Sequence, residues 1–410
     1  MTAVEPRVCR LRRTATVVNP AVHAQERTST RVDRGRSYYP ERYTGSHPSH
    51  QSKATTEDDV PRISRFASAV LLTVSVAATT VNSAQNFAVD KWNIGGEGGT
   101  DYLTAEAGTG RVFVSRGTRV TVLDGLTGKL LGEVVDTPRV HGIAIAAKSS
   151  HGFTTNGGDS TVTMFDLKTL AVIKKINVPG GGLDGIMFDE YDDKVILTNH
   201  SRPTGTLVAI DPDSGNIVGT TELADTAPEG AAPNGKGWIY VNNEERNTIQ
   251  IVDVKSWKAI KLWPLAPCKG PTGIAYDHGS DRIFVGCGGT SVVVDGTSGK
   301  VVATIRNGGR VDALGWDPLQ RLIYIPGGEP GNVTVVRQDS PDKYTVVATV
   351  PTMPGAKTIG VDPVAHRAYL FQPEYGPAPA PDPGAVAPSP GGRNGPRGPV
   401  IGAWLFAIRQ

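Results

Sequence analysis

The chain has 410 residues, with 49 glycines, 30 prolines and a formal net charge of +2. The basic excess lies in residues 1–84, so the remainder is slightly acidic, which removes any electrostatic reason to bind nucleic acid or an anionic membrane. After residue 85 the apolar runs are short and broken by turn residues, which excludes a mainly helical protein and indicates an all-β one.

Residues 1–61 are rich in Arg, Ser and Thr and show no apolar period, so we expect them to be disordered. Signal peptides normally start a chain, but here the apolar segment comes only after this leader. We hypothesise that translation starts near Val60 and that residues 1–59 are a gene-model artefact. N-terminal sequencing of the native protein tests this, and any peptide from residues 1–59 would contradict it.

Residues 62–84 have the pattern of a secretory signal peptide. Arg62 and Arg65 precede an apolar segment that begins at Phe66 and is too short to span a membrane comfortably, and small residues follow it. An uncleaved membrane anchor is the second interpretation. We therefore expect a secreted or periplasmic protein with no membrane span in its mature part.

From residue 85 to the end the chain repeats a unit of about 42 residues. Each unit contains four strand-length runs separated by turn residues, and in five units the third run ends in an aspartate: Asp124, Asp166, Asp211, Asp253 and Asp295. Four short antiparallel strands per repeat are typical of a β-propeller blade. Residues 85–410 are thus predicted to form a seven-bladed β-propeller, with blades that begin near residues 100, 140, 183, 228, 271, 311 and 356.

The seventh blade is incomplete as it is read forward, with strands at 357–362, 366–372 and 400–409. The N-terminal strand 87–94 is predicted to supply its fourth strand, to pair with 400–409 and to close the ring. A Pro/Gly-rich insertion at 373–399, between the second and third strands of this blade, is expected to form a loop.

The repeats resemble those of the YncE-like, YVTN-repeat propeller family. The segments that carry the resemblance are Phe153-Thr-Thr-Asn156, Ile196-Leu-Thr-Asn199, Tyr240-Val-Asn-Asn243 and the Val-x-Asp-x-x-(Thr/Ser)-Gly-Lys turns that end at Lys129 and Lys300. The resemblance covers residues 85–410 apart from the insertion. It implies a secreted or periplasmic seven-bladed propeller and no particular activity.

Aligned repeats place one residue per blade at the start of the innermost strand, where side chains converge on the mouth of the central channel: Asp101, His141, Asp184, Glu229, Thr272, Asp312 and Lys357. Four carboxylates and a histidine could hold a divalent cation such as Ca²⁺, Mg²⁺ or Mn²⁺. The alternative, which we favour over a metal site, is a solvated polar channel in which Lys357 partly balances the acids. A binding site for a small ligand at this ring is more credible than a metal site.

The loops from second to third strand on the same face offer further polar residues: Arg116, Asn156, Asn199, His200, Asn242, Asn243, Glu244 and Glu245. His200 and His141 could form a proton relay or a zinc pair, although loop histidines are more often only exposed. The asparagines suit turn backbone as well as ligand contact. Acidic turns at 189–193, 277–281 and 362–366 recur at one place in the blade and are interpreted as turn caps rather than calcium sites.

Two of the three cysteines fall in the fifth blade. Cys268 precedes its first strand and Cys287 ends its second, so antiparallel pairing brings them together. An oxidising compartment favours a Cys268–Cys287 disulfide, while Cys9 falls in the leader. There is no Cys-x-x-Cys-His, phosphate loop, dinucleotide fingerprint or Gly-x-Ser-x-Gly in the sequence, which excludes covalent haem attachment and the enzymes built on those motifs.

Three functional hypotheses follow. The first is a non-catalytic, monomeric propeller that binds a small molecule or a protein partner at the channel face. The second is a hydrolase or lyase, with or without a metal ion, that uses the ring carboxylates with His141 or His200. The third is a redox subunit with a non-covalent haem or quinone.

Overall fold

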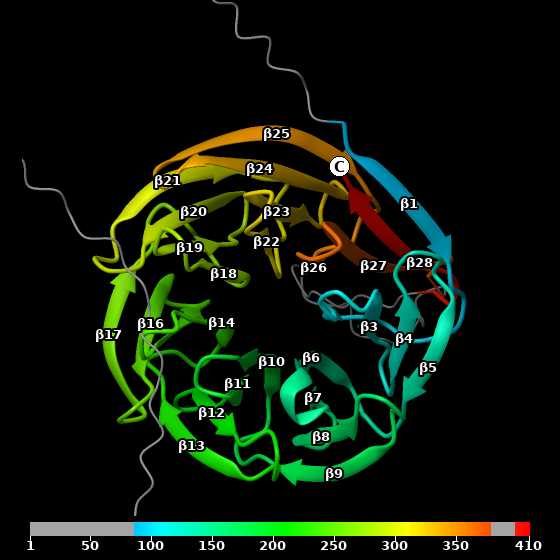
Figure 1. Cartoon of the computed structure of the whole chain (residues 1–410), viewed down its shortest axis with the longest axis horizontal. Helices are drawn as coiled ribbons and strands as arrows, with labels where there is room; N and C mark the ends of the chain where they lie inside the picture. The colour runs from blue at the N-terminus through cyan, green and yellow to red at the C-terminus, as the bar shows by residue number, and fades with distance from the viewer. Residues whose placement is uncertain (1–85, 379–397) are drawn as a thin grey trace, which may run out of the picture. The chain divides into compact units, whose positions relative to one another are not determined.

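The computed structural model describes residues 86–378 and 398–410. These residues form seven four-stranded antiparallel sheets, arranged as blades around a central axis (Figure 1). The seven-bladed β-propeller predicted from the repeat is therefore confirmed. The expected leader, the signal peptide and most of the insertion at 373–399 lie outside the described residues.

In the first six blades the strands run in chain order from the axis to the rim, whereas the outermost strand of the seventh comes from the N-terminal end of the domain; Figure 1 labels them. The first three blades consist of β2 (Leu103–Ala105), β3 (Arg111–Ser115), β4 (Val120–Asp124) and β5 (Leu130–Val134); β6 (Val140–Ala146), β7 (His151–Asn156), β8 (Thr161–Asp166) and β9 (Val172–Asn177); and β10 (Leu183–Asp189), β11 (Lys194–Asn199), β12 (Thr206–Ile210) and β13 (Ile217–Glu222). A short 3₁₀ turn, η1 (Ala147–Ser149), follows β6.

The next three blades consist of β14 (Pro228–Pro233), β15 (Trp238–Asn243), β16 (Thr248–Asp253) and β17 (Lys258–Pro264); β18 (Ile274–Asp277), β19 (Arg282–Val285), β20 (Thr290–Asp295) and β21 (Val301–Arg306); and β22 (Gly315–Asp317), β23 (Leu322–Gly327), β24 (Asn332–Ser340) and β25 (Lys343–Pro351). The seventh contains β26 (Gly360–Asp362), β27 (Arg367–Tyr375), β28 (Val400–Arg409) and β1 (Ala88–Asn93). No helix among the described residues is long and apolar enough to cross a membrane.

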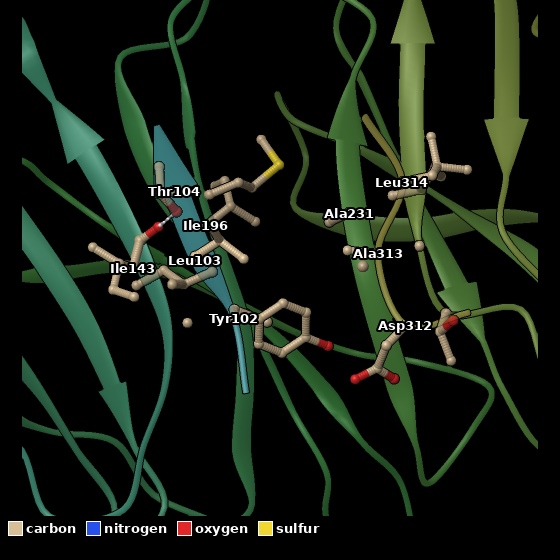
Figure 2. A pocket seen from close by; sticks show the side chains of 17 residues that line it. Tyr102, Leu103, Thr104, Ile143, Ile196, Ala231, Asp312, Ala313 and Leu314 are labelled. Atoms are coloured by element: carbon tan, nitrogen blue, oxygen red, sulfur yellow. Dashed lines mark hydrogen bonds between the residues drawn. The ribbon is translucent and has the colours of Figure 1, made fainter. Parts of the chain in front are cut away.

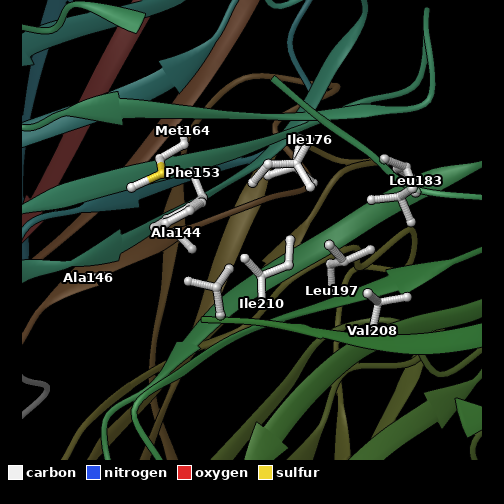
Figure 3. Close-up of a cluster of buried hydrophobic side chains, with 12 residues drawn as sticks. Ala144, Ala146, Phe153, Met164, Ile176, Leu183, Leu197, Val208 and Ile210 are labelled. Atoms are coloured by element: carbon white, nitrogen blue, oxygen red, sulfur yellow. The ribbon is translucent and has the colours of Figure 1, made fainter. Parts of the chain in front are cut away.

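Burial along the strands follows their place in the blade. The second and third strands are buried on both faces, as in β19 and β20, and so carry continuous Val, Ile and Phe rather than an alternating pattern. The outermost strands, such as β13 and β17, are mostly exposed. The core consists of apolar layers between neighbouring blades, one of which joins Phe153 and Met164 of the second blade to Leu197 and Ile210 of the third (Figure 3).

The ring closes between the two ends of the propeller. β1 pairs with β28 from Ala88 opposite Arg409 to Asn93 opposite Trp404, as the sequence predicts. Asp90 of β1 forms ion pairs with Arg409 at 3.1 Å and with Arg367 of β27 at 3.2 Å. The seventh blade is thus assembled from both ends of the domain.

The first strand starts later than expected in the first, fifth, sixth and seventh blades, at residues 103, 274, 315 and 360 rather than near 100, 271, 311 and 356. Backbone bonding to the neighbouring blade explains the difference in the sixth blade. There the amides of Asp312 and Ala313 both donate to the carbonyl of Lys357 in the seventh blade, so they are not available to the ladder of their own blade.

The insertion also starts later than expected, because β27 continues to Tyr375. Pro373 pairs with Ala403 and Glu374 with Gly402 of β28. β26 pairs only with Arg367–Tyr369, so this part of β27 has a strand on one side alone. A proline is tolerated on such an edge, where its missing amide hydrogen interrupts no second ladder.

The recurring aspartates cap turns. At the end of the third strands, Asp166 accepts hydrogen bonds from the amide and the hydroxyl of Thr169, and Asp253 does the same with Ser256. In the turns from first to second strand, Asp362 accepts from the amides of Val364 and Ala365. The capping interpretation of these acidic turns is therefore supported by their contacts.

Candidate functional site

In three blades a β-bulge positions the ring residue at the channel mouth. The register of β6 against β7 shifts between Val140 and Ile143, and β10 and β14 shift at the equivalent place. A bulge leaves residues without a partner on the next strand and re-aims their side chains. The residues re-aimed in this way are His141, Asp184 and Glu229.

A small residue follows the ring residue in five blades, as Gly142, Gly185, Gly230, Gly273 and Ala313. The neighbouring blade leaves little room at these positions. A Cβ on Gly273 would lie 2.5 Å from the backbone of Ala313, and one on Gly230 would lie 2.7 Å from the carbonyl oxygen of Thr272. The recurring x-Gly-Ile pattern therefore reflects the close approach of adjacent blades around the axis.

Tyr102 takes this position in the first blade, and its side chain extends toward Asp312 on the far side of the channel (Figure 2). Its hydroxyl lies 3.5 Å from Oε2 of Glu229 in the fourth blade. Burial and then the charges of Asp184 and Asp312 raise the pKa of Tyr102 well above its usual value, so the hydroxyl remains a hydrogen-bond donor.

A cavity of about 190 Å³ lies against Tyr102, within the innermost strands (Figure 2). Most of its lining is apolar, including Leu103, Ile143, Ile186 and Leu314. Tyr102 therefore separates the polar mouth from an apolar interior. The sequence analysis missed this residue, although a tyrosine among glycines in the aligned repeats was a usable signal.

A continuous series of ion pairs and polar contacts runs around the mouth. Lys357 pairs with Asp312 and, at 3.3 Å, with Oδ1 of Asp101. The other carboxylate oxygen of Asp101 lies 2.5 Å from Nδ1 of His141. Acidic and basic groups thus alternate from the sixth blade through the seventh and first to the second.

Asp184 continues the series into the third and fourth blades. Its Oδ1 lies 3.6 Å from Nδ1 of His141, and its Oδ2 lies 3.3 Å from Nε2 of His200. The same nitrogen of His200 lies 3.5 Å from Oε1 of Glu229. Asp184, with 15% of its side chain exposed, is therefore shared between two histidines.

Asp101 and His141 favour the ion-paired form. Burial raises the pKa of Asp101, but the hydrogen bond with His141 and the charge of Lys357 outweigh burial and lower it overall. Burial lowers the pKa of His141, but the hydrogen bond with Asp101 and the charge of Asp184 raise it overall. The proton between these two side chains therefore balances one carboxylate of the ring.

The remaining acids are crowded. Burial, followed by the charge of Asp101, raises the pKa of Asp184 to about 6. Burial and the charge of Asp184 raise the pKa of Glu229 well above its usual value. Burial also raises the pKa of Asp312, against the opposing charge of Lys357. A cation bound among these groups would relieve their mutual repulsion.

Two sets of side chains have metal-ligand spacing. One contains Asp101, His141 and Asp184, the other contains Asp184, His200 and Glu229, and within each set the ligand atoms lie within 4.8 Å of one another. One imidazole nitrogen and two carboxylates suit first-row transition metals. These residues therefore fit a metal ion as well as an organic cation.

At the fifth blade the ring is interrupted. The hydroxyl of Thr272 donates to the carbonyl of Val311 at 2.6 Å, so it is engaged in the junction with the sixth blade. A hollow of about 470 Å³ lies here, lined among others by Lys269, Arg310 and Lys357. Cys268 and Cys287 form a disulfide in this blade, with Cα atoms 5.6 Å apart.

The asparagines of the second-to-third-strand loops donate hydrogen bonds to the backbone and to turn residues. The side-chain amides of three of them donate to the threonine opposite on the third strand, in the pairs Asn156–Thr161, Asn199–Thr206 and Asn243–Thr248. Asn242 donates to the carbonyls of Thr272 and Gly273 in the next blade. These contacts give the four asparagines structural roles.

Arg116, expected beside the ligand site, also has a structural role. Its guanidinium is buried and donates to the carbonyls of Gly95, Gly96, Glu97 and Gly98. It also lies 4.9 Å from the ring of Phe371. Arg116 therefore fastens the segment that links β1 to the first blade. Of the predicted loop residues, His200 lies against the carboxylates of the ring, and Glu244 lines a hollow with Thr272, Asp312 and Lys357.

The fold and the site together define a seven-bladed β-propeller with an acidic, histidine-containing channel mouth.

No protein-family model and no curated protein matches the sequence. Two similar solved structures are a chain of hydrazine synthase from Kuenenia stuttgartiensis and a chain of the mitotic checkpoint complex. The first has a TM-score of 0.61 at 16% identity and covers 67% of this chain and 93% of its own. The second has a TM-score of 0.62 at 15% identity and covers 75% and 96%. At these identities the comparisons show the fold alone.

Proposed function

We propose that this protein is a non-catalytic ligand-binding propeller whose channel mouth holds a small, positively charged ligand. The observation that carries the proposal is the polar series at the mouth, in which four carboxylates face one lysine and two histidines. Concave sites with a few convergent polar groups are the usual places for small ligands.

The raised pKa values of Asp184 and Glu229 give the binding a driving force. Each carboxylate is costly to ionise where it stands, because burial and neighbouring charge oppose ionisation. A cation removes part of that cost, whereas an anion would add to it. The site therefore selects for positive charge.

A thermal-shift titration of the purified full chain tests this proposal. Putrescine, Mn²⁺ and Zn²⁺ serve as cations, and citrate and phosphate as anions. At least one cation is expected to stabilise the fold saturably, by about 2.7 kcal/mol at a concentration of 100 Kd, and the anions are not. Asp184→Asn should abolish the shift.

Asp213→Asn is the matched control, because Asp213 is an exposed carboxylate on the turn between β12 and β13, at the opposite end of the blade from the mouth. The proposal fails if no cation stabilises the protein, or if the two variants lose the shift equally.

We also propose that the protein is located outside the cytoplasm and that it belongs to the YncE-like family. The Cys268–Cys287 disulfide supports an oxidising compartment, as does the signal-peptide pattern of residues 62–84. The segments that end in Asn156, Asn199 and Asn243 support the family, because each forms the second strand of a blade. Cell fractionation tests the first point, with protein confined to the cytoplasm as the contradicting result.

A further inference from the structure

We infer that the channel mouth is a dinuclear site, in which the carboxylate of Asp184 bridges two divalent first-row transition-metal ions. The inference rests on the proposed function, since it names the cation that the mouth holds. Asp101 and His141 complete one half-site, and His200 and Glu229 complete the other.

The two half-sites have the same donors. Each combines one imidazole nitrogen, one carboxylate of its own and one oxygen of Asp184. Oδ1 of Asp184 faces Nδ1 of His141 at 3.6 Å, and Oδ2 faces Nε2 of His200 at 3.3 Å. Ions with metal–ligand distances of about 2.0–2.2 Å fit between atoms spaced in this way, whereas Oδ2 of Asp101 and Nδ1 of His141, 2.5 Å apart, must separate to ligate one ion. Because the two oxygens face different histidines, the geometry favours two ions over one.

The hydrogen bonding of Asp184 supports the bridge independently. Across residues 86–378 and 398–410, no group donates a hydrogen bond to Oδ1 of Asp184, although that atom is buried. Glu229, with 8% of its side chain exposed, lies 3.5 Å from both Tyr102 Oη and His200 Nε2, which is the limit of hydrogen bonding. A buried carboxylate oxygen without a close hydrogen-bond donor raises the free energy of the folded protein, and a coordinated cation would remove that cost.

The histidines narrow the class of metal. Ca²⁺ and Mg²⁺ prefer ligand sets made of oxygen alone, whereas Mn²⁺, Fe²⁺, Co²⁺ and Zn²⁺ accept imidazole with carboxylate. Both histidine nitrogens must be unprotonated to bind, so metal uptake would release the proton shared by Asp101 and His141 and the proton that Nε2 of His200 donates to the carbonyl of Pro228 at 3.0 Å. With three protein ligands each, the ions would keep positions open to the mouth for water or a small ligand.

Equilibrium dialysis tests the inference. The purified full chain is stripped with chelator, dialysed against Zn²⁺ or Mn²⁺ in separate experiments, and the bound metal is counted by mass spectrometry. The wild-type protein should bind two ions per chain. His141→Ala and His200→Ala should each retain one ion, and Asp184→Asn should lose both at the same free-metal concentration.

His278→Ala is the matched control, because His278 is an exposed histidine that lines a hollow shared with the turns from first to second strand, at the other end of the channel. It should bind two ions. Thermal melts in metal-free buffer check that each variant folds.

Three results would overturn the inference: no bound metal, one ion that either histidine variant abolishes, or two ions that survive Asp184→Asn. A chain that binds no metal but is stabilised by putrescine through Asp184 would contradict the dinuclear site and leave the proposed function standing. Failure of both the metals and putrescine would contradict both.

Discussion

At the residue scale, the most informative contrast is between side chains that hold the scaffold and side chains that face the channel. Arg116 and the loop asparagines donate their hydrogen bonds to backbone carbonyls and to hydroxyls in turns. Asp184 and Glu229 lie in the ring with few such contacts and with raised pKa values. Mutation of the first group should therefore lower the stability of the fold and leave ligand binding unchanged. Mutation of the second should weaken ligand binding and change stability little.

Arg116→Ala should destabilise the fold by about 3 kcal/mol, because the carbonyls of residues 95–98 lose its hydrogen bonds, with that of Glu97 keeping one from Arg119, and because a buried side chain is removed. Denaturant unfolding measures the loss. Cation binding at the mouth should be unchanged in the folded variant. Arg119→Ala, which removes a partly exposed neighbour that pairs with Glu133 and donates one hydrogen bond to the carbonyl of Glu97, should cost about 1 kcal/mol. Equal losses in the two variants would contradict the structural role of Arg116.

Tyr102→Ala should cost about 1–3 kcal/mol, since a half-buried aromatic ring is removed from the channel. Tyr102→Phe should be nearly neutral, because the hydroxyl contacts Glu229 only at 3.5 Å. Denaturant unfolding of both variants distinguishes ring packing from hydrogen bonding. A loss for Tyr102→Phe as large as that for Tyr102→Ala would show that the hydroxyl, rather than the ring, holds this position.

At the element scale, the blade repeat and its turns were predictable, because hydrophobic runs and capping residues are local in sequence. The aspartate at the end of the third strand bonds residues two or three positions further on, so its role is visible in the pattern itself. The bulges at Val140–Ile143 and Leu183–Ile186 were not predictable, because they depend on register with the next strand. Neither was the contact of Arg116 with residues 95–98, which lie 18–21 positions earlier in the chain, on the other side of β2 and β3.

The capped turns predict how stability depends on acid. Hydrogen bonds from Thr169, Ser214 and Ser256 lower the pKa values of Asp166, Asp211 and Asp253. A carboxyl whose pKa is lower in the folded state stabilises the fold above its unfolded pKa, near 3.9, and loses that contribution as the pH falls through its folded value.

A triple Asp166→Asn/Asp211→Asn/Asp253→Asn variant should therefore lose less stability than the wild type when the pH is lowered from 5 to about 2. Denaturant unfolding at each pH measures the slope. Asp213→Asn, which changes an exposed carboxylate in one of the same turns, should leave the slope as in the wild type. A triple variant with the wild-type slope would contradict the account.

At the scale of the whole molecule, the ring places residues of six blades around one mouth, although they are far apart in the chain. The repeat alignment predicted six of these residues because equivalent positions in a propeller converge on the axis. It did not predict that Thr272 turns to the carbonyl of Val311, because that depends on a contact between blades. His200, named from the sequence as a loop histidine that could act with His141, does join the series through Asp184 and Glu229. The closure by β1 was predictable, since the seventh blade otherwise lacks a strand.

Deletion of residues 87–94 should cost far more than a terminal truncation usually does. It removes β1, breaks the ion pairs of Asp90 and exposes the long edge of β28. Thermal melts and size-exclusion chromatography should show a large loss of stability together with self-association, and a synthetic 86–94 peptide should partly reverse both. An unchanged melt would mean that the ring holds without this strand.

The most direct test of the central claim is a crystal structure of the protein grown with Mn²⁺, with anomalous diffraction used to locate the metal. We predict two anomalous peaks at the channel mouth, one between Asp184 and His141 and the other between Asp184 and His200. A well-ordered mouth without any anomalous peak, or peaks only elsewhere on the molecule, would contradict this prediction.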